Sequence, residues 1–329
     1  MSTQSIPVFS LQDLKKGLQK KALLECVSKK GLFYLSDYGF DDTRHRTATN
    51  VGLDFFQNGS AQEKALCSNL DKSQRRGFSE LEAESTATIT NNGNYSDYSM
   101  CYSMGLSDNV FPNDNFKSIW SDYYNDIYDI ARDTVGAVMS AAGVFTDNEE
   151  KFEEFMDCNP LLRLRYFPDV PEDRIAEKVP MRMAPHYDLS IVTLIQQFGC
   201  PNGFVSLHVE VDGELIKVPA VPNTILILCG AVAKIVSKGK ILAPIHHVAS
   251  PPTDLAVGSE RTSMVFFLRP NSNFSFSVPE ARKLGLDVCI KSEQATFGQW
   301  VGENYLELSS HNEPDKPKAK DMQRQLESV

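Results

Sequence analysis

A proline inside a short stretch of polar side chains limits the local backbone that this chain can adopt. Pro185 has no amide hydrogen and pushes the residue before it towards an extended conformation, so the stretch Met183–Asp188 favours a β-strand over a helix. Side chains two positions apart share one face of a strand, whereas on a helix they diverge. His186 and Asp188 are therefore expected to hold an imidazole and a carboxylate side by side.

A third side chain of the kind that binds metals lies 60 residues further along, at His246. That separation leaves room for several strands to run out and return. A His-x-Asp pair alone is more often a hydrogen-bonded surface pair, but two histidines and a carboxylate on one face form the facial triad of non-haem Fe(II) oxygenases. The adjacent His247 would point to the opposite face of an extended segment, so we predict His246 as the ligand, although Ile245 and Val248 do not decide the alternation.

Arg261 and Ser263 follow His246 after 15 residues and again share one strand face. A guanidinium fork beside a hydroxyl group suits a carboxylate. A metal triad together with a carboxylate clamp is what a 2-oxoglutarate site requires, so the three elements predict Fe(II)/2-oxoglutarate chemistry. The alternative from another class, a non-catalytic binding protein with a degenerate iron site, is disfavoured by the complete set of ligands.

Composition restricts the class of protein and its partners. The 329 residues, of which 42% are hydrophobic, can bury a sizeable core. The formal net charge of −10 disfavours nucleic acid and anionic membranes as partners. The chain has no apolar run long enough to span a membrane and no signal pattern at its N-terminus. Its seven cysteines include no CxxC pair, which indicates reduced thiols in a cytoplasmic protein.

The hydrophobic periodicity changes from helical to extended near the middle of the chain. We predict helices at residues 11–27, 43–56, 115–142 and 147–157. We predict strands at 7–9, 32–35, 162–166, 190–197, 203–211, 214–218, 224–229, 246–249 and 261–268. Short strands preceded by helices indicate a mainly β fold, a barrel or jelly roll buttressed by helices. We expect one domain over residues 1–310 and a flexible polar tail over 311–329.

The sequence pattern does not determine whether two stretches are buried or exposed to solvent. Arg163 and Arg165 alternate with leucines on one predicted strand, so they share a face. Arginines inside a barrel would need anions, because an unpaired buried charge costs several kcal/mol, but a solvent-exposed face fits the pattern equally well. The Ser-, Tyr- and Asn-rich stretch 84–105 suits strands and turns beside a polar pocket, or a surface hairpin.

Several long stretches carry a resemblance to a known family. They are Lys30–Leu35, Arg75–Phe78, Glu84–Ala87, Tyr95–Gly105, Pro160–Pro168, Met183–Ser190 and Arg261–Pro270. Across residues 5–308 the chain resembles the deacetoxycephalosporin C synthase (penicillin N expandase) and hydroxylase group of the Fe(II)/2-oxoglutarate-dependent dioxygenases. The resemblance implies a double-stranded β-helix (jelly-roll) core, Fe(II) as the metal, and 2-oxoglutarate and O₂ as cosubstrates.

The resemblance also implies an activity in antibiotic biosynthesis. That activity is the oxidative ring expansion of penicillin N to deacetoxycephalosporin C, hydroxylation of that product, or both. The alternative is the same mechanism, as a hydroxylase, desaturase or ring-modifying enzyme, acting on a different small acidic natural product of secondary metabolism. The expected partner is a small-molecule substrate, a β-lactam or another acidic metabolite.

Individual roles follow from the resemblance position by position. It implies that the iron ligands and catalytic residues are His186, Asp188 and His246. It implies that the residues at 2-oxoglutarate are Arg261, Ser263, Met183 and Thr193. It implies that the residues at the substrate end are Arg75, Arg163, Arg165, Arg269 and Asn304. The chain departs from the expandase pattern at Asn159, Glu307, Ser309 and Ser310, and these departures concern the substrate and not the metal.

Overall fold

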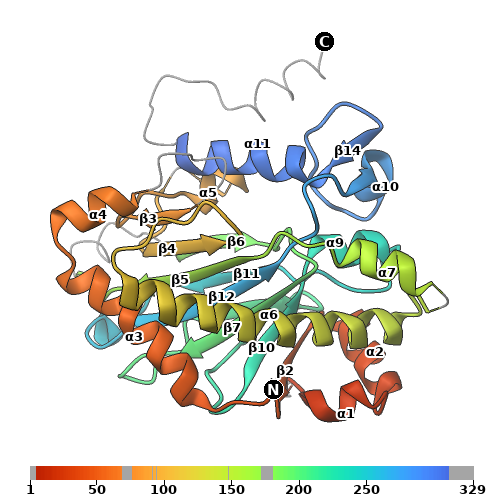
Figure 1. Ribbon diagram of the computed structural model, residues 1–329, viewed down its shortest axis with the longest axis horizontal. Helices are drawn as coiled ribbons and strands as arrows, with labels where there is room; N and C mark the ends of the chain where they lie inside the picture. Colours follow the sequence, from red (N-terminus) through yellow and green to blue (C-terminus); the bar gives the residue numbers. More distant parts are fainter. Residues whose placement is uncertain are drawn as a thin grey trace.

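Two β-sheets lie face to face, and a layer of helices covers the outer face of the larger sheet (Figure 1). The computed structural model describes residues 5–68, 76–90, 92–93, 95–146, 148–171 and 181–310, with side chains up to 304 in the last range. The predicted substrate residue Arg75 and the predicted tail 311–329 lie outside the described residues. The arrangement is the double-stranded β-helix with flanking helices that the sequence predicted.

The larger sheet has eight strands in the order β1-β2-β10-β7-β12-β5-β4-β3. Their bounds are β1 Val8–Ser10, β2 Leu32–Ser36, β3 Gly77–Ser79, β4 Met100–Gly105, β5 Leu161–Phe167, β7 Val192–Phe198, β10 Ile225–Cys229 and β12 Arg261–Leu268. Except for the parallel pair β1–β2, neighbouring strands are antiparallel. The strands predicted from alternation coincide with β5 and β12 to within one residue at each end.

The smaller sheet has four strands in the order β6-β11-β8-β9. Their bounds are β6 Met181–His186, β8 Leu207–Val211, β9 Glu214–Lys217 and β11 His246–Ala249. Asp212 and Gly213 join β8 to β9 with φ angles of 53° and 78°, the positive values that a type I′ hairpin turn needs. A separate pair, β13 (Ser275–Ser277) and β14 (Gln294–Thr296), lies near the end of the described chain.

The long helix α6 (Asp114–Ala142) packs its apolar stripe on the larger sheet (Figure 1). Trp120 is fully buried in this layer and stacks on Phe116, with ring centroids 4.8 Å apart. Asn113 caps the first turn, and Gly143 ends the helix in a left-handed conformation. The other α-helices of the described residues are α1 Leu11–Lys15, α2 Lys20–Lys29, α3 Asp42–Asn58, α4 Ala61–Cys67, α5 Thr86–Ile89, α7 Glu149–Phe155, α9 Ala231–Val236, α10 Val278–Lys283 and α11 Phe297–Ser310. None of the helices in the described part of the chain combines the length and the apolar character of a membrane span.

The structure corrects three of the predicted elements. The helix predicted over residues 11–27 is divided into α1 and α2, because Gly17 and Gln19 adopt positive φ angles of 74° and 60°. Leu18, between the two helices, is consequently half exposed. The extended stretch expected to carry both metal ligands ends at His186, so Asp188 lies in the loop after β6. A short helix, α5, occupies part of the stretch 84–105 that was predicted as strands and turns.

Candidate active site

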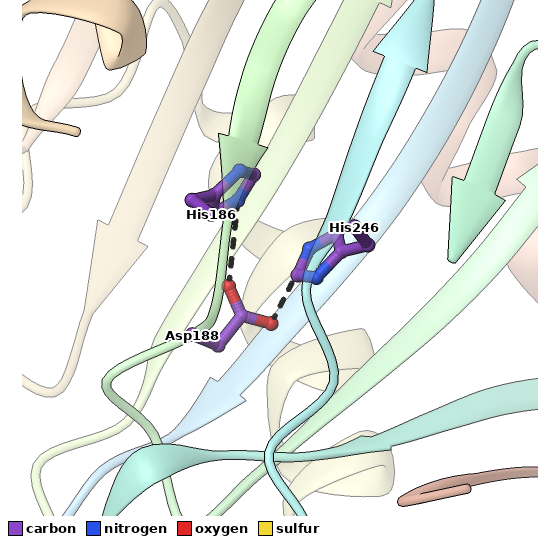
Figure 2. Close-up of side chains that lie close together, drawn as sticks. All are labelled: His186, Asp188 and His246. Atoms are coloured by element: carbon purple, nitrogen blue, oxygen red, sulfur yellow. Dashed lines mark ion pairs between the residues drawn. The ribbon is translucent and has the colours of Figure 1, made fainter. Parts of the chain in front are cut away.

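Strand pairing brings two of the three predicted metal ligands together. His186, the last residue of β6, lies directly opposite His246, the first residue of β11, with ring centroids 4.3 Å apart. Asp188 turns back from the following loop, so that its Oδ1 is 3.8 Å from His186 Nε2 and its Oδ2 is 3.9 Å from His246 Nε2 (Figure 2). One ligand atom from each residue lies within 4.8 Å of the others, which is close enough for all three to hold one metal ion.

Hydrogen bonds to the backbone orient both imidazole rings. His186 Nδ1 lies 2.8 Å from the carbonyl oxygen of Ala184, and His246 Nδ1 lies 3.3 Å from that of Pro244. A carbonyl only accepts, so each Nδ1 carries the hydrogen and each Nε2 presents its lone pair towards Asp188. This is the outer-shell arrangement found at metal-bound histidines.

The donor set fits a ferrous ion. Asp188 Oδ2 is buried and makes no hydrogen bond, although buried polar atoms are normally paired. A cation between the three side chains would satisfy this oxygen and both Nε2 atoms. Two imidazoles and one carboxylate on one side of an ion match Fe(II) and leave positions for other ligands.

Burial favours the neutral form of the His186 imidazole, which is the form that binds metals. Burial, together with the neighbouring His246, lowers the pKa of His186 to about 3, despite the opposing effect of Asp188. The imidazole therefore stays neutral at ordinary pH, and no proton has to leave before a metal binds.

His247 points away from this group, as the alternation predicted. Its ring stacks on His208 of the neighbouring strand β8, with centroids 5.2 Å apart and an angle of 14° between the planes. The group that could hold a metal among the described residues thus contains His246 and not His247.

Arg261 is buried at the start of β12 and is held by neutral partners. Its Nη2 donates to Ser263 Oγ at 2.7 Å and to Gln197 Oε1 at 3.2 Å, and its Nη1 donates to Ser206 Oγ at 3.1 Å. The guanidinium carbon lies 5.5 Å from the ring centroid of Phe167. Burial lowers the pKa of Arg261 to about 10, so the group remains charged at neutral pH. No carboxylate in the described part of the chain forms an ion pair with it.

One cavity of about 470 Å³ connects these groups. Its wall includes the predicted residues His186, Asp188, His246, Arg261, Ser263, Met183, Arg163, Arg165, Arg269 and Asn304. Arg269 Nε donates to the carbonyl oxygen of Asn159 at 3.1 Å, and Asn304 Nδ2 donates to that of Trp300 at 2.7 Å. All the predicted site residues that the structure describes, apart from Thr193, therefore line a single space.

Thr193 reaches the cavity only through a neighbour. It is fully buried, and its Oγ1 lies 2.8 Å from Oγ of Ser190, which lines the cavity. A role for Thr193 near 2-oxoglutarate would consequently be to hold Ser190 in place.

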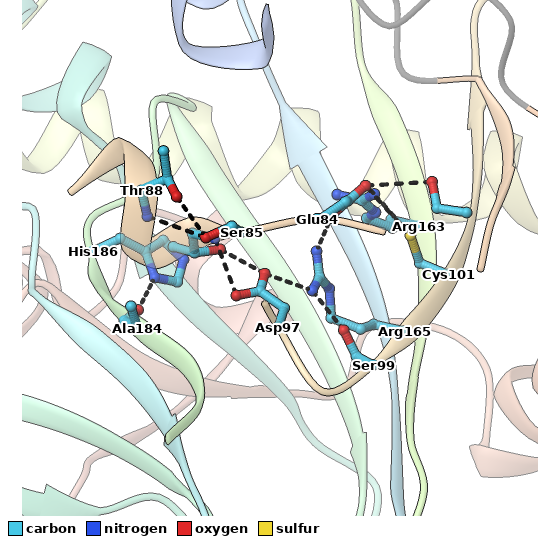
Figure 3. A network of polar contacts seen from close by, with 12 residues as sticks. Glu84, Ser85, Thr88, Asp97, Ser99, Cys101, Arg163, Arg165, Ala184 and His186 are labelled. Atoms are coloured by element: carbon cyan, nitrogen blue, oxygen red, sulfur yellow. Dashed lines mark hydrogen bonds and ion pairs between the residues drawn. The ribbon is translucent and has the colours of Figure 1, made fainter. Parts of the chain in front are cut away.

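Arg163 and Arg165 line the cavity, and carboxylates of the same chain form ion pairs with them (Figure 3). Glu84 pairs with both arginines, and Asp97 pairs with Arg165 at 3.3 Å. The predicted requirement for anions is thus met from within the protein. Sequence reasoning missed Glu84 and Asp97, whose only signal was two acidic residues in a stretch otherwise rich in Ser, Tyr and Asn.

Sequence comparison places these residues in a known superfamily. The sequence model of the 2OG-Fe(II) oxygenase superfamily matches residues 158–270, which include all three proposed metal ligands and Arg261. The deacetoxycephalosporin C synthase of Amycolatopsis lactamdurans is 50% identical over 309 residues, covering 94% of this chain and 98% of that protein. The deacetoxycephalosporin C hydroxylase of Streptomyces clavuligerus is 48% identical over 315 residues, covering 95% and 99% respectively.

Solved structures support the fold. A full-length protein of Neurospora crassa, solved in complex with alpha-KG, superimposes with a TM-score of 0.74 over 93% of this chain and 97% of that chain. The two sequences are 19% identical, so this likeness concerns the architecture alone.

Proposed function

The chain belongs to the family of deacetoxycephalosporin C synthases and hydroxylases within the 2OG-Fe(II) oxygenase superfamily, and from this premise we propose that it oxidises a β-lactam. It is an oxygenase that uses Fe(II), 2-oxoglutarate and O₂. The proposed reaction is ring expansion of penicillin N, hydroxylation of the expanded product, or both. The observation that supports this most strongly is a cavity that combines a facial triad with Arg261 and a second group of arginines.

We assign the metal and cosubstrate roles as follows. His186, Asp188 and His246 hold Fe(II), which when bound supplies the oxidising power for decarboxylating 2-oxoglutarate and removing hydrogen from the substrate. Arg261 and Ser263 bind the distal carboxylate of 2-oxoglutarate, since the buried guanidinium has only neutral partners among the described residues. Met183 lines the same space, and Thr193 supports it through Ser190.

The substrate end is assigned to the remaining polar groups of the cavity. Arg163, Arg165, Arg269 and Asn304 line it, and guanidinium groups suit the carboxylates of an acidic β-lactam. Arg75 is proposed for the same end from the family resemblance. The protein's contribution to the chemistry is to place one C–H bond of the substrate beside the metal and to exclude competing reactions.

The two candidate reactions differ in their stoichiometry. Expansion consumes penicillin N, 2-oxoglutarate and O₂ and gives deacetoxycephalosporin C, succinate, CO₂ and water. Hydroxylation consumes the expanded product, 2-oxoglutarate and O₂ and gives the hydroxylated product, succinate and CO₂. Mass spectrometry therefore separates a product that has lost two hydrogen atoms from one that has gained an oxygen atom.

The test is product analysis with the iron-loaded protein, 2-oxoglutarate and either penicillin N or deacetoxycephalosporin C. We expect product and succinate in equal amounts with at least one of the two. Succinate release without a β-lactam product would favour the second candidate, the same chemistry on another acidic natural product. The departures at Asn159, Glu307, Ser309 and Ser310 are the observation behind that second candidate.

We also propose that the enzyme acts in the cytoplasm. All seven cysteines are free thiols, six of them buried, which suits a reducing compartment.

A further inference from the structure

A single buried carboxylate bridges two arginines of the cavity wall (Figure 3). Glu84 Oε1 accepts a hydrogen bond from Arg163 Nη2, and Glu84 Oε2 accepts one from Arg165 Nη2 at 2.9 Å. All three side chains are less than a tenth exposed. Each oxygen of Glu84 therefore serves one arginine, and the two contacts together fix the relative orientation of the guanidinium groups.

Asp97 fastens the second arginine from another side. Arg165 Nη1 donates to Asp97 Oδ2 at 3.3 Å and to Ser99 Oγ at 2.9 Å. Asp97 also accepts from Thr86, from the backbone nitrogen at 3.0 Å and from Oγ1 at 2.7 Å. Because Thr86 begins helix α5 and is two residues after Glu84, both carboxylates are tied to the same segment beside the cavity.

In this group two guanidinium groups face two carboxylates. Arg163 and Arg165 are two positions apart on β5 and share its inner face, so without a common partner they would repel each other. The N–H groups that the shared carboxylate holds in place would attract a ligand carboxylate, as in other charge-assisted pairs.

We propose that Glu84 is a positioning residue that holds Arg163 and Arg165 together as one carboxylate-binding surface. It thereby determines how strongly the cavity prefers a carboxylate over an uncharged group at this end. This inference rests on the proposed function, because it takes the ligand to be an acidic β-lactam. Glu84 acts through the arginines and does not touch the reacting atoms.

The test compares a carboxylate ligand with its ester. Benzylpenicillin and its methyl ester are titrated into the protein loaded with Fe(II) and 2-oxoglutarate, without O₂, and the ratio of the two dissociation constants is measured. We expect the wild-type protein to prefer the acid and Glu84→Gln to reduce that preference at least tenfold. A glutamine accepts on one side only, and its amide N–H groups would oppose the other guanidinium.

Two further variants separate positioning from folding. Glu84→Asp keeps the charge but is too short to serve both arginines, so its preference should fall at least threefold. Glu80→Gln removes an exposed carboxylate four residues earlier and should keep the wild-type ratio. The ratio of the two dissociation constants is taken within each variant, so a loss of folded protein affects both constants equally. An unchanged affinity for 2-oxoglutarate would show that the part of the cavity around Arg261 is intact.

The inference is overturned if wild-type protein binds acid and ester equally, or if both Glu84 variants keep the wild-type ratio. The proposed function is judged separately, by product formation with penicillin N or deacetoxycephalosporin C. Acid preference that depends on Glu84 without any β-lactam product would remove the proposed function and leave the positioning role. Product formation with an unchanged ratio in the Glu84 variants would support the proposed function and remove the positioning role of Glu84.

Discussion

Arg165 lies directly opposite Ser263 across the antiparallel strands β5 and β12. Ser263 in turn accepts a hydrogen bond from Arg261, so two guanidinium groups are anchored on neighbouring strands of one cavity wall. Their surroundings differ, because Arg165 is paired with Glu84 and Asp97 whereas Arg261 has only neutral partners among the described residues. Arg261 is therefore the cation whose carboxylate partner should come from a ligand.

Replacing Arg261 by glutamine should weaken 2-oxoglutarate binding more than it harms the fold. A hydrogen bond to a charged group is worth about 1.5–3 kcal/mol, so KM for 2-oxoglutarate should rise roughly tenfold to a hundredfold. Removing a buried charge that has no ion-pair partner in the described chain should leave Tm unchanged or raise it. Steady-state succinate release checks the first expectation, with Arg44→Gln, an exposed arginine of α3 paired with Asp126, as the control. An unchanged KM in Arg261→Gln would remove the proposed role.

Replacing His186 or Asp188 by alanine should abolish iron binding and succinate release. Each variant removes one of three ligands, and we expect activity to fall by at least about a hundredfold, beyond the loss typical of outer-shell changes. His247→Ala is the matched control, since it removes an imidazole from the same strand as His246 but from the opposite face. Measured Fe(II) binding and succinate release check this expectation. Full turnover by His186→Ala or Asp188→Ala would contradict the triad.

The stability of the protein should fall as the pH is lowered from about 6.5 towards about 4, and His45 should contribute to that loss. Burial lowers the pKa of His45 from 6.5 to about 4, and its two ring nitrogens contact Tyr123 Oη at 2.8 Å and Tyr38 Oη at 3.2 Å. The unfolded chain takes up the proton first, so the contribution is complete above pH 6.5 and declines below it. The loss is at most about 1.4 kcal/mol for each pH unit.

Urea unfolding across this pH range measures the effect. His45→Gln should show a shallower decline in the free energy of unfolding than the wild-type protein. His186 is present in both proteins and contributes equally to both curves. Parallel curves would show that His45 binds protons equally in the folded and unfolded states, so that burial does not lower its pKa.

Gly31→Ala should destabilise the protein more than Gly285→Ala. Both glycines have positive φ angles, 68° and 77°, so alanine at either position carries a similar backbone strain. A Cβ at Gly31 would clash with the carbonyl oxygen of Leu242, whereas a Cβ at Gly285 would meet nothing within 4 Å. The clash should cost about 1–3 kcal/mol more, as measured by urea unfolding. Because Leu242 precedes the strand that begins at His246, Gly31→Ala should also weaken Fe(II) binding, and equal losses in the two variants would contradict this account.

The sequence predicted the strands of the sheets better than the helices around them. Strand β12 begins and ends where alternation and the flanking residues predicted, because a strand between a helical layer and a cavity shows two distinct faces. The break between α1 and α2 could not be foreseen, since leucines at helical spacing continue through Gly17. Helix α9 is six residues long in a buried apolar run, for which periodicity does not distinguish a helix from a strand.

Residue types and spacing predicted which three side chains could bind the metal, but they did not predict how the fold brings these side chains together. His186 and His246 meet because β6 and β11 are neighbours in that register, which a separation of 60 residues does not determine. The pairing of Glu84 with Arg163 and Arg165 could not be predicted from the sequence for a similar reason. It joins a segment before α5 to strand β5, and no periodic pattern connects the two.

The adjacent histidines of β11 give that strand one imidazole on each face. A slip by one residue would exchange His246 for His247 and turn every side chain of the strand over. The stacking of His247 on His208 opposes such a slip, as does the irregular register between His246 and Val248. Iron uptake by a refolding chain would therefore report the alignment of the small sheet, and a misaligned sheet would yield a folded but iron-free protein.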